Sequence, residues 1–200
     1  FYMYISYMKI QHNIYSLFYA FTPIIIISFF LLDSMLNGHY KGYVFLIGLA
    51  FSIITSIIIG NTIGLSNNTV NSSETCIPFT INKMTFFSKI PINTTILMYT
   101  ATNLLYTALV HDFILQNLPF FVILGLLIMN DSFYVVVNGC YSSFQIGIAC
   151  LIGLIIAMLW SIVLHKSNNK SLIYNMGVDN SMLCEIPRKK TYKCKNNKKK

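Results

Sequence analysis

Long apolar runs alternate with short polar segments along most of this chain. One uncharged apolar run, residues 144–164, has about the length that an α-helix needs to cross the hydrocarbon core of a bilayer. Trp160 lies near its end, and His165 and Lys166 follow it, as is typical where a span enters the headgroup region. The pattern therefore predicts a membrane-spanning helix over 144–164.

Further apolar runs predict more spans, which lie near residues 14–32, 42–65, 93–112 and 118–137. Pro23 lies inside the first of them, which membrane helices tolerate when neighbouring groups satisfy the freed carbonyl. Residues 33–41 are expected to form a short polar link, and residues 116–119 a short turn. We therefore predict an all-α fold, a polytopic transmembrane helical bundle of about five spans over 1–165, followed by a basic polar tail over 166–200.

The fourth apolar run is interrupted by Asn130, Asp131 and Ser132. The apolar part before them is short for a span, so two interpretations stay open. Either the helix continues through Asp131 to Val137, or it ends there and the chain re-enters the membrane. Because a carboxyl group at membrane depth is costly, Asp131 is a functional candidate; the alternative is a solvated helix end.

The composition agrees with a membrane protein. Hydrophobic residues make up 55% of the 200 residues and charged residues only 10%, whereas a soluble domain carries about 25% charged residues. The net charge is +8, and ten of the fourteen basic residues follow Leu164. Beyond the lipid bilayer itself, such a lysine-rich tail attracts anionic lipid or nucleic acid electrostatically.

The same charges predict the orientation. With five spans, eleven basic residues fall on the side of the tail and three on the other side. The positive-inside rule then places the tail in the cytoplasm, and the loops 66–91 and 130–143 outside or in a lumen.

Small side chains recur every fourth residue in two of the predicted spans. They are Gly48, Ser52, Ser56 and Gly60 in the second span, and Ala149, Gly153, Ala157 and Ser161 in the fifth. On a helix this spacing forms a groove that another helix can approach closely. We expect both grooves to be buried against helices, whether of this chain, of a second copy or of another membrane protein.

The third span carries the most polar face. Thr100, Asn103, Thr107 and His111 follow helical spacing and share one side of it. In hydrocarbon such groups turn toward other helices or a wet cavity. Hydrogen bonding between helices and a substrate site are both compatible with this face.

Cysteines and acceptor sequons give further candidates on the predicted outer side. Asn67 and Asn71 each begin a glycosylation sequon, and Cys76 and Cys140 lie in the two outer loops. An oxidising compartment favours a Cys76–Cys140 disulfide. The cysteine spacing fits no zinc motif, so we expect no metal site and no cofactor.

The order of these parts resembles the membrane half of the type-2 phosphatidic acid phosphatase family. A long loop precedes a Pro-led turn that opens a helix (IPINTTILMYT), and a polar turn opens a last helix rich in Gly and Ala (NGCYSSFQIGIACLIGLIIAMLW). The resemblance covers residues 60–164 and implies a six-helix fold. The chain would then lack one helix before Phe1, which a truncated N-terminus would explain.

The chemistry of that family does not carry over. Thr95 stands where the resemblance implies the histidine of a Pro-Ser-Gly-His turn, and Tyr134 where it implies an arginine. Cys140 and Phe144 stand where it implies the second histidine and its aspartate. Phosphoryl transfer depends on positioning and charge neutralisation by such groups, so no such activity is expected.

The layout and the tail pattern VDNSMLCEIPRKKTYKCK also resemble multi-pass membrane proteins of nucleocytoplasmic large DNA viruses. This resemblance implies a virion membrane or a membrane derived from the endoplasmic reticulum, with the tail on the cytoplasmic or virion-interior side. Three hypotheses follow. The first is a structural or scaffolding protein of a viral or virus-factory membrane. The second is a lipid phosphate phosphatase-like enzyme. The third is a small transporter or channel that uses Asp131 and the polar face of the third span.

Overall fold

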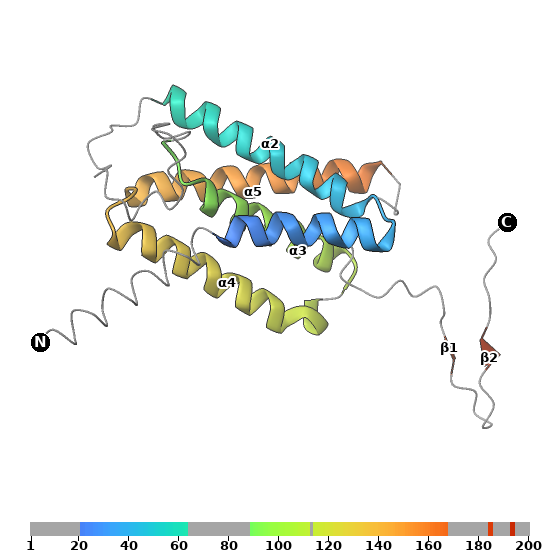
Figure 1. The fold of residues 1–200 in the computed structure, drawn as a ribbon. Coiled ribbons are helices and arrows are strands. Elements are labelled where there is room, and N and C mark those ends of the chain that lie inside the picture. Colours follow the sequence, from blue (N-terminus) through green and yellow to red (C-terminus); the bar gives the residue numbers. More distant parts are fainter. Residues whose placement is uncertain (1–20, 64–88, 113, 168–183, 186–192, 195–200) are drawn as a thin grey trace, which may run out of the picture.

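The computed structural model describes residues 21–63, 89–112, 114–167, 184–185 and 193–194 (Figure 1). Within this part of the chain there are five helices: Phe21–Asn37, α2 (Lys41–Thr62), α3 (Ile92–Val110), α4 (Ile114–Val137) and α5 (Ser143–Lys166). In the tail, β1 (Cys184–Glu185) and β2 (Lys193–Cys194) pair antiparallel, with Cys184 opposite Cys194. The all-α prediction is confirmed for the body of the protein.

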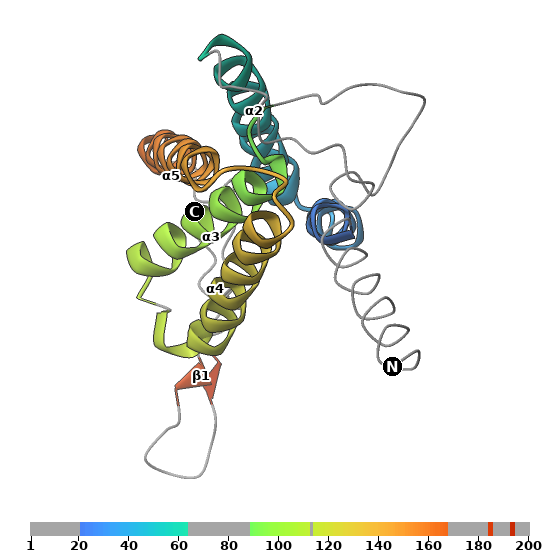
Figure 2. The same cartoon turned by 90° about the vertical axis from the view of Figure 1, so that its left-hand side faces the viewer.

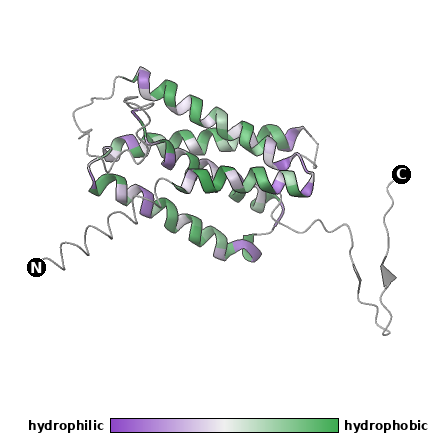
Figure 3. Ribbon diagram, viewed as in Figure 1, coloured by the Kyte–Doolittle hydropathy of each residue, from purple (hydrophilic) through white to green (hydrophobic). Residues whose placement is uncertain are grey.

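Three of the described helices are long and apolar enough to cross a membrane, namely α2, α4 and α5. Helix Phe21–Asn37 is also apolar but shorter over its described residues. α3 is not among the three, because threonine, asparagine and tyrosine lower its hydropathy. Apolar residues nevertheless extend along most of each helix (Figure 3).

α3 is the central helix of the bundle. It contacts α2, α4 and α5, and ten of its nineteen residues are buried. Figure 2 shows it between α4 and α5. Gly153 of α5 lies beside Thr95 of α3, and Ser161 farther along α5 bonds to Asn103 farther along α3, so these two helices run parallel. Both therefore end at the same end of the bundle.

An aromatic core joins three helices. The rings of Phe30 and Phe45 are stacked with their centroids 3.9 Å apart, which joins helix Phe21–Asn37 to α2. Tyr99 of α3 meets Phe45 edge to face at 5.3 Å, and its hydroxyl donates to the Phe45 carbonyl at 3.3 Å. This core holds the helices on either side of the turn at residues 38–40 against each other, and α2 against α3.

The polar link predicted over residues 33–41 is mostly wrong. Asp33 to Asn37 are helical, and the Asn37 amide donates to the Asp33 carboxylate at 2.8 Å across one turn. Gly38, with φ at +62°, then ends the helix, because glycine tolerates the left-handed conformation that such an end requires. Local side-chain bonding therefore continues the helix through residues whose polarity suggested a link.

α4 is one continuous helix through Asp131 to Val137, so the first of the two interpretations holds. The turn predicted over residues 116–119 is wrong, because α4 already begins at Ile114 and includes Pro119. Pro119 lies early in the helix, where its missing N–H removes only the bond to the Leu115 carbonyl. Leu115 is strongly exposed, so this carbonyl lies near the surface of the protein.

Candidate functional site

The polar face of α3 points into the bundle. Thr100, Asn103 and Thr107 are buried, and His111 caps the C-terminal end of the helix. The Asn103 amide donates to the Ser161 hydroxyl of α5 at 3.0 Å. The hydroxyls of Thr100 and Thr107 instead donate to carbonyls of their own helix, at 2.8 and 2.9 Å. Of the two interpretations of this face, hydrogen bonding between helices is the one seen at Asn103.

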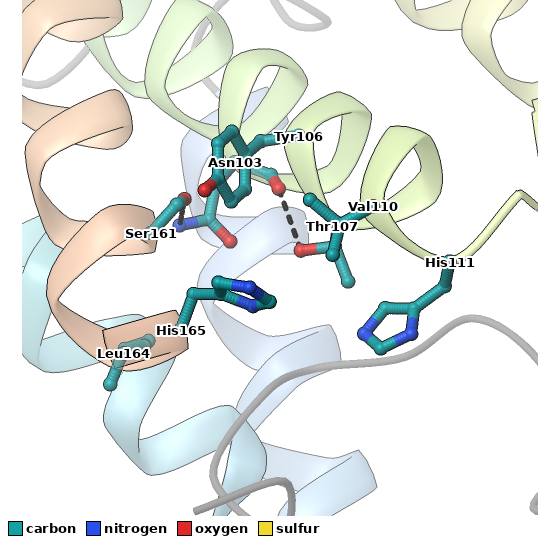
Figure 4. Close-up of a pocket in the computed structure, with 8 residues that line it drawn as sticks. All are labelled: Asn103, Tyr106, Thr107, Val110, His111, Ser161, Leu164 and His165. Atoms are coloured by element: carbon teal, nitrogen blue, oxygen red, sulfur yellow. Dashed lines mark hydrogen bonds between the residues drawn. The ribbon is translucent and has the colours of Figure 1, made fainter. Parts of the chain in front are cut away.

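Beyond Asn103 this face borders a small cavity between the ends of α3 and α5. The cavity has a volume of about 20 Å³ and is lined by Asn103, Tyr106, Thr107, Val110, His111, Ser161, Leu164 and His165. In Figure 4 the imidazoles of His111 and His165 approach the same space from different helices. Six of the eight lining residues carry a polar side-chain group, and the cavity lies at the end of the bundle.

Sequence reasoning named Asn103, Thr107 and His111 but missed the part that α5 contributes. His165 was interpreted only as an interfacial residue after the last span. A signal was present, because His165 continues the every-fourth-residue series of Ala149, Gly153, Ala157 and Ser161. That series faces α3 along the length of α5, so its next member reaches the end of the polar face.

Asp131 does not join this cavity. Its carboxylate accepts a hydrogen bond from the Thr94 hydroxyl at 2.7 Å, near the beginning of α3 and at the opposite end of the bundle. Both side chains are buried, with Asp131 only 6% exposed. The next residue, Thr95, shares a 2.9 Å hydrogen bond with Ser56 of α2. Neighbouring threonines thus connect α3 to the helices on either side.

The two series of small residues allow close contact with α3. Gly48, Ser52, Ser56 and Gly60 of α2 are all buried, and so are Ala149, Gly153 and Ala157 of α5. A Cβ atom added at Gly153 would lie 2.8 Å from the Thr95 carbonyl oxygen and 2.9 Å from Met98 Cβ. A Cβ atom at Gly48 would overlap the hydroxyl of Tyr99 and meet the indole of Trp160. Both series therefore meet α3, and Gly48 also meets α5.

Three of the four positions that the phosphatase resemblance singles out are buried inside the protein. Thr95 is bonded to Ser56, Tyr134 is buried beside Val135 and Cys140, and Phe144 is exposed. Cys140 is disulfide-bonded and only 2% exposed. Of these residues, Tyr134 and Cys140 lie in one apolar cluster, whereas Thr95 bonds to α2.

Several predicted sites lie outside the described residues. These are the sequon residues Asn67 and Asn71 and the predicted disulfide partner Cys76, so the Cys76–Cys140 pairing stays a prediction. Cys150 is a free thiol. Beside Cys140, burial raises the pKa of Tyr141 to about 12, so its phenol keeps its proton to a higher pH than an ordinary tyrosine does.

Comparison with protein-family models, with curated proteins and with solved structures finds no match. The described residues contain no group of three or more His, Cys, Asp or Glu side chains placed to hold a metal ion. What this protein does must therefore be inferred from the packing of α3 and from the two polar sites at its ends.

Proposed function

We propose that this chain is a multi-pass integral membrane protein whose helical bundle has a structural or scaffolding role. The observation that carries the proposal is the use of polar groups on α3. Its buried side chains bond to each neighbouring helix in turn: Thr94 to α4, Thr95 to α2 and Asn103 to α5. In membranes such interhelical bonds contribute about 0.6 kcal/mol on average. Polar groups used in this way hold a bundle together.

The outer surfaces support a lipid environment. On α2 the side chains of Ile47, Phe51, Ile54 and Ile58 form one exposed apolar stripe, opposite the small buried residues. On α4 the exposed apolar surface is more extensive, and Phe133 is 70% exposed. Soluble proteins rarely expose continuous apolar surfaces of this size. Apolar groups outside and hydrogen-bonded polar groups inside are the arrangement that a bilayer favours.

The proposed topology has five spans, with α3 crossing in contact with the more apolar α2, α4 and α5. Its polar groups face other helices, so its low hydropathy does not prevent it from spanning. Lys41 and Lys166 lie at the end of the bundle where α3 and α5 terminate, and Lys89 lies at the other end. The charge rule then assigns the end with Lys41 and the basic tail to the cytoplasm or virion interior.

A structural role fits the described residues better than the two alternatives. A phosphatase needs histidines and cations at the positions held by Thr95, Cys140 and Tyr134. A transporter that used Asp131 would need this carboxyl group in a wet path, whereas it is buried and bonded to Thr94. The proposal that the membrane is viral rests on the resemblance of the layout and of the tail.

The test uses the full chain expressed in cells. Alkaline carbonate should leave it in the membrane pellet, and protease added to sealed vesicles from the cytoplasmic side should remove the tail after Leu164 while sparing residues 66–91. Release by carbonate, or cleavage within 66–91 with a protected tail, would contradict the proposed topology.

The role is tested separately from the topology. Chemical cross-linking in the native membrane should give discrete oligomers or complexes with other membrane proteins. Purified protein in liposomes should neither hydrolyse phosphatidic acid nor conduct ions. Hydrolysis that is lost on mutation of Cys140 or Thr95, or ion flux that is lost in Asp131→Asn, would favour one of the alternatives instead.

A further inference from the structure

We infer that the cavity between the C-terminal ends of α3 and α5 binds one divalent transition-metal ion, with the imidazoles of His111 and His165 as ligands. This goes beyond a structural role of the bundle and does not depend on it. The site arises only in the fold, because the two histidines belong to different helices and are far apart in the chain.

The size of the cavity suits an ion with a water molecule. Its volume of about 20 Å³ exceeds the roughly 10–15 Å³ that one water molecule requires. A divalent metal ion is smaller than a water molecule, and imidazole nitrogens bind Zn²⁺ at about 2.0–2.1 Å. Figure 4 shows the His111 ring approaching this space from the end of α3 and the His165 ring approaching it from α5.

Asn103 adds an oxygen ligand. Its amide nitrogen donates to the Ser161 hydroxyl at 3.0 Å, which holds the side chain in one orientation. In this orientation the carbonyl oxygen of the amide points away from Ser161, toward the cavity and His165 (Figure 4). Two nitrogens and one oxygen then face the same space, and the bond to Ser161 acts as the outer support that metal ligands commonly have.

The direction of the helices favours a cation over an anion. α3 and α5 run parallel and both terminate here, so the negative ends of two helix dipoles meet at this end of the bundle. Lys166, the last residue of α5, is exposed and does not line the cavity, so its positive charge does not occupy this space. Imidazole nitrogens and an amide oxygen supply electron pairs that coordinate a cation and repel an anion.

The ligand types select the metal. Imidazole nitrogen suits Zn²⁺, Ni²⁺ and Cu²⁺, whereas Mg²⁺ and Ca²⁺ require sites made mainly of oxygen. With three protein ligands the site resembles an open zinc site that keeps a position for water. It has fewer ligands than a closed four-cysteine site, so binding should be weaker and reversible.

The test is a calorimetric titration with Zn²⁺ of the purified full chain in lipid nanodiscs. A Cys184→Ser, Cys194→Ser background removes the two tail thiols as competing ligands. In this background we expect one Zn²⁺ per chain. His111→Gln and His165→Gln should each weaken binding by at least about tenfold, because even loss of an outer support costs 10–100-fold. His39→Gln is the matched control, since His39 is exposed in the turn at the same end of the bundle and does not line the cavity.

Co²⁺ absorption provides a readout that needs no histidine variant. Binding at this site should give weak visible bands without the intense near-ultraviolet transition of a thiolate ligand. The inference would be overturned by the absence of saturable binding, by a thiolate spectrum, or by unchanged affinity in either His111→Gln or His165→Gln. Equal loss of binding in His39→Gln would overturn it as well.

Discussion

Replacing Gly153 with leucine should separate α5 from α3. Gly153 is buried, and a Cβ atom there would lie 2.8 Å from the Thr95 carbonyl oxygen, 2.9 Å from Met98 Cβ and 3.1 Å from the Tyr99 amide nitrogen. Two of these three atoms belong to the α3 backbone, so no side-chain rotation can relieve the contact. The two helices have to move apart.

The magnitude follows from two opposing effects. Inserting one or more methylene groups into a packed interior costs about 1–3 kcal/mol, while replacing glycine in a helix gains up to about 1 kcal/mol from helix propensity. Gly153→Ala should therefore destabilise the protein by roughly 0–2 kcal/mol. Gly153→Leu adds further atoms and also strains the Asn103–Ser161 bond, so its cost should exceed about 3 kcal/mol.

The same helix supplies the matched control. Gly147 of α5 is exposed, and a Cβ atom there would meet nothing within 4 Å. Gly147→Leu should therefore leave the stability of the bundle within about 1 kcal/mol of the parent. Trp160 is the only tryptophan of the chain and packs against the core at Gly48, so its fluorescence reports whether α5 stays docked.

The assay is equilibrium unfolding in mild detergent, followed by Trp160 emission. The expected order of stability is parent and Gly147→Leu, then Gly153→Ala, then Gly153→Leu. If Gly153→Leu unfolds at the same denaturant concentration as Gly147→Leu, α5 does not contact α3 closely at this position and the packing argument fails.

Three further results are expected. Thr94→Val should destabilise the bundle by about 1–3 kcal/mol, because it leaves the buried Asp131 carboxyl group without its hydrogen-bond donor. Asp131→Asn should cost less, because the asparagine side chain still offers an acceptor to Thr94. Equal costs of the two variants in detergent unfolding would contradict this. Non-reducing mass spectrometry should find Cys140 linked to Cys76, and opening this loop of roughly 60 residues should cost on the order of 4 kcal/mol; a link to a tail cysteine would refute both the pairing and the topology. Burial raises the pKa of Tyr141 to about 12, so the protonated phenol contributes stability fully below pH 10 and loses that contribution between about pH 10 and 12. Tyr141→Phe should therefore lose less stability than the parent over this range. A variant with the same alkaline unfolding profile as the parent would contradict this assignment.

The apolar runs and the spacing of small residues were readable from the sequence because both are properties of a single helix. α2, α4 and α5 follow the predicted runs at 42–65, 118–137 and 144–164, and the buried sides of α2 and α5 include the predicted series of small residues. Helix ends were read less well. Polar residues at 33–37 and a proline at 119 suggested breaks. The first helix instead continues to Asn37 with a local Asn37–Asp33 hydrogen bond, and α4 includes Pro119 because a proline this early in a helix removes only one backbone hydrogen bond.

Which helix each surface meets was decided only by the tertiary structure. Helical spacing shows that Gly153 lies in a groove, but not that the Thr95 backbone fills this groove. The sequence likewise shows that Asp131 is a carboxyl group within an apolar run, but not that Thr94 is its hydrogen-bond partner. The pairing of His111 with His165 across one cavity likewise depends on α3 and α5 running parallel. The physical reason is that lipid and helix interiors are similarly apolar, so hydropathy alone does not specify partners. Close packing and interhelical hydrogen bonds do so, and both depend on the crossing and direction of helices that are distant in the chain.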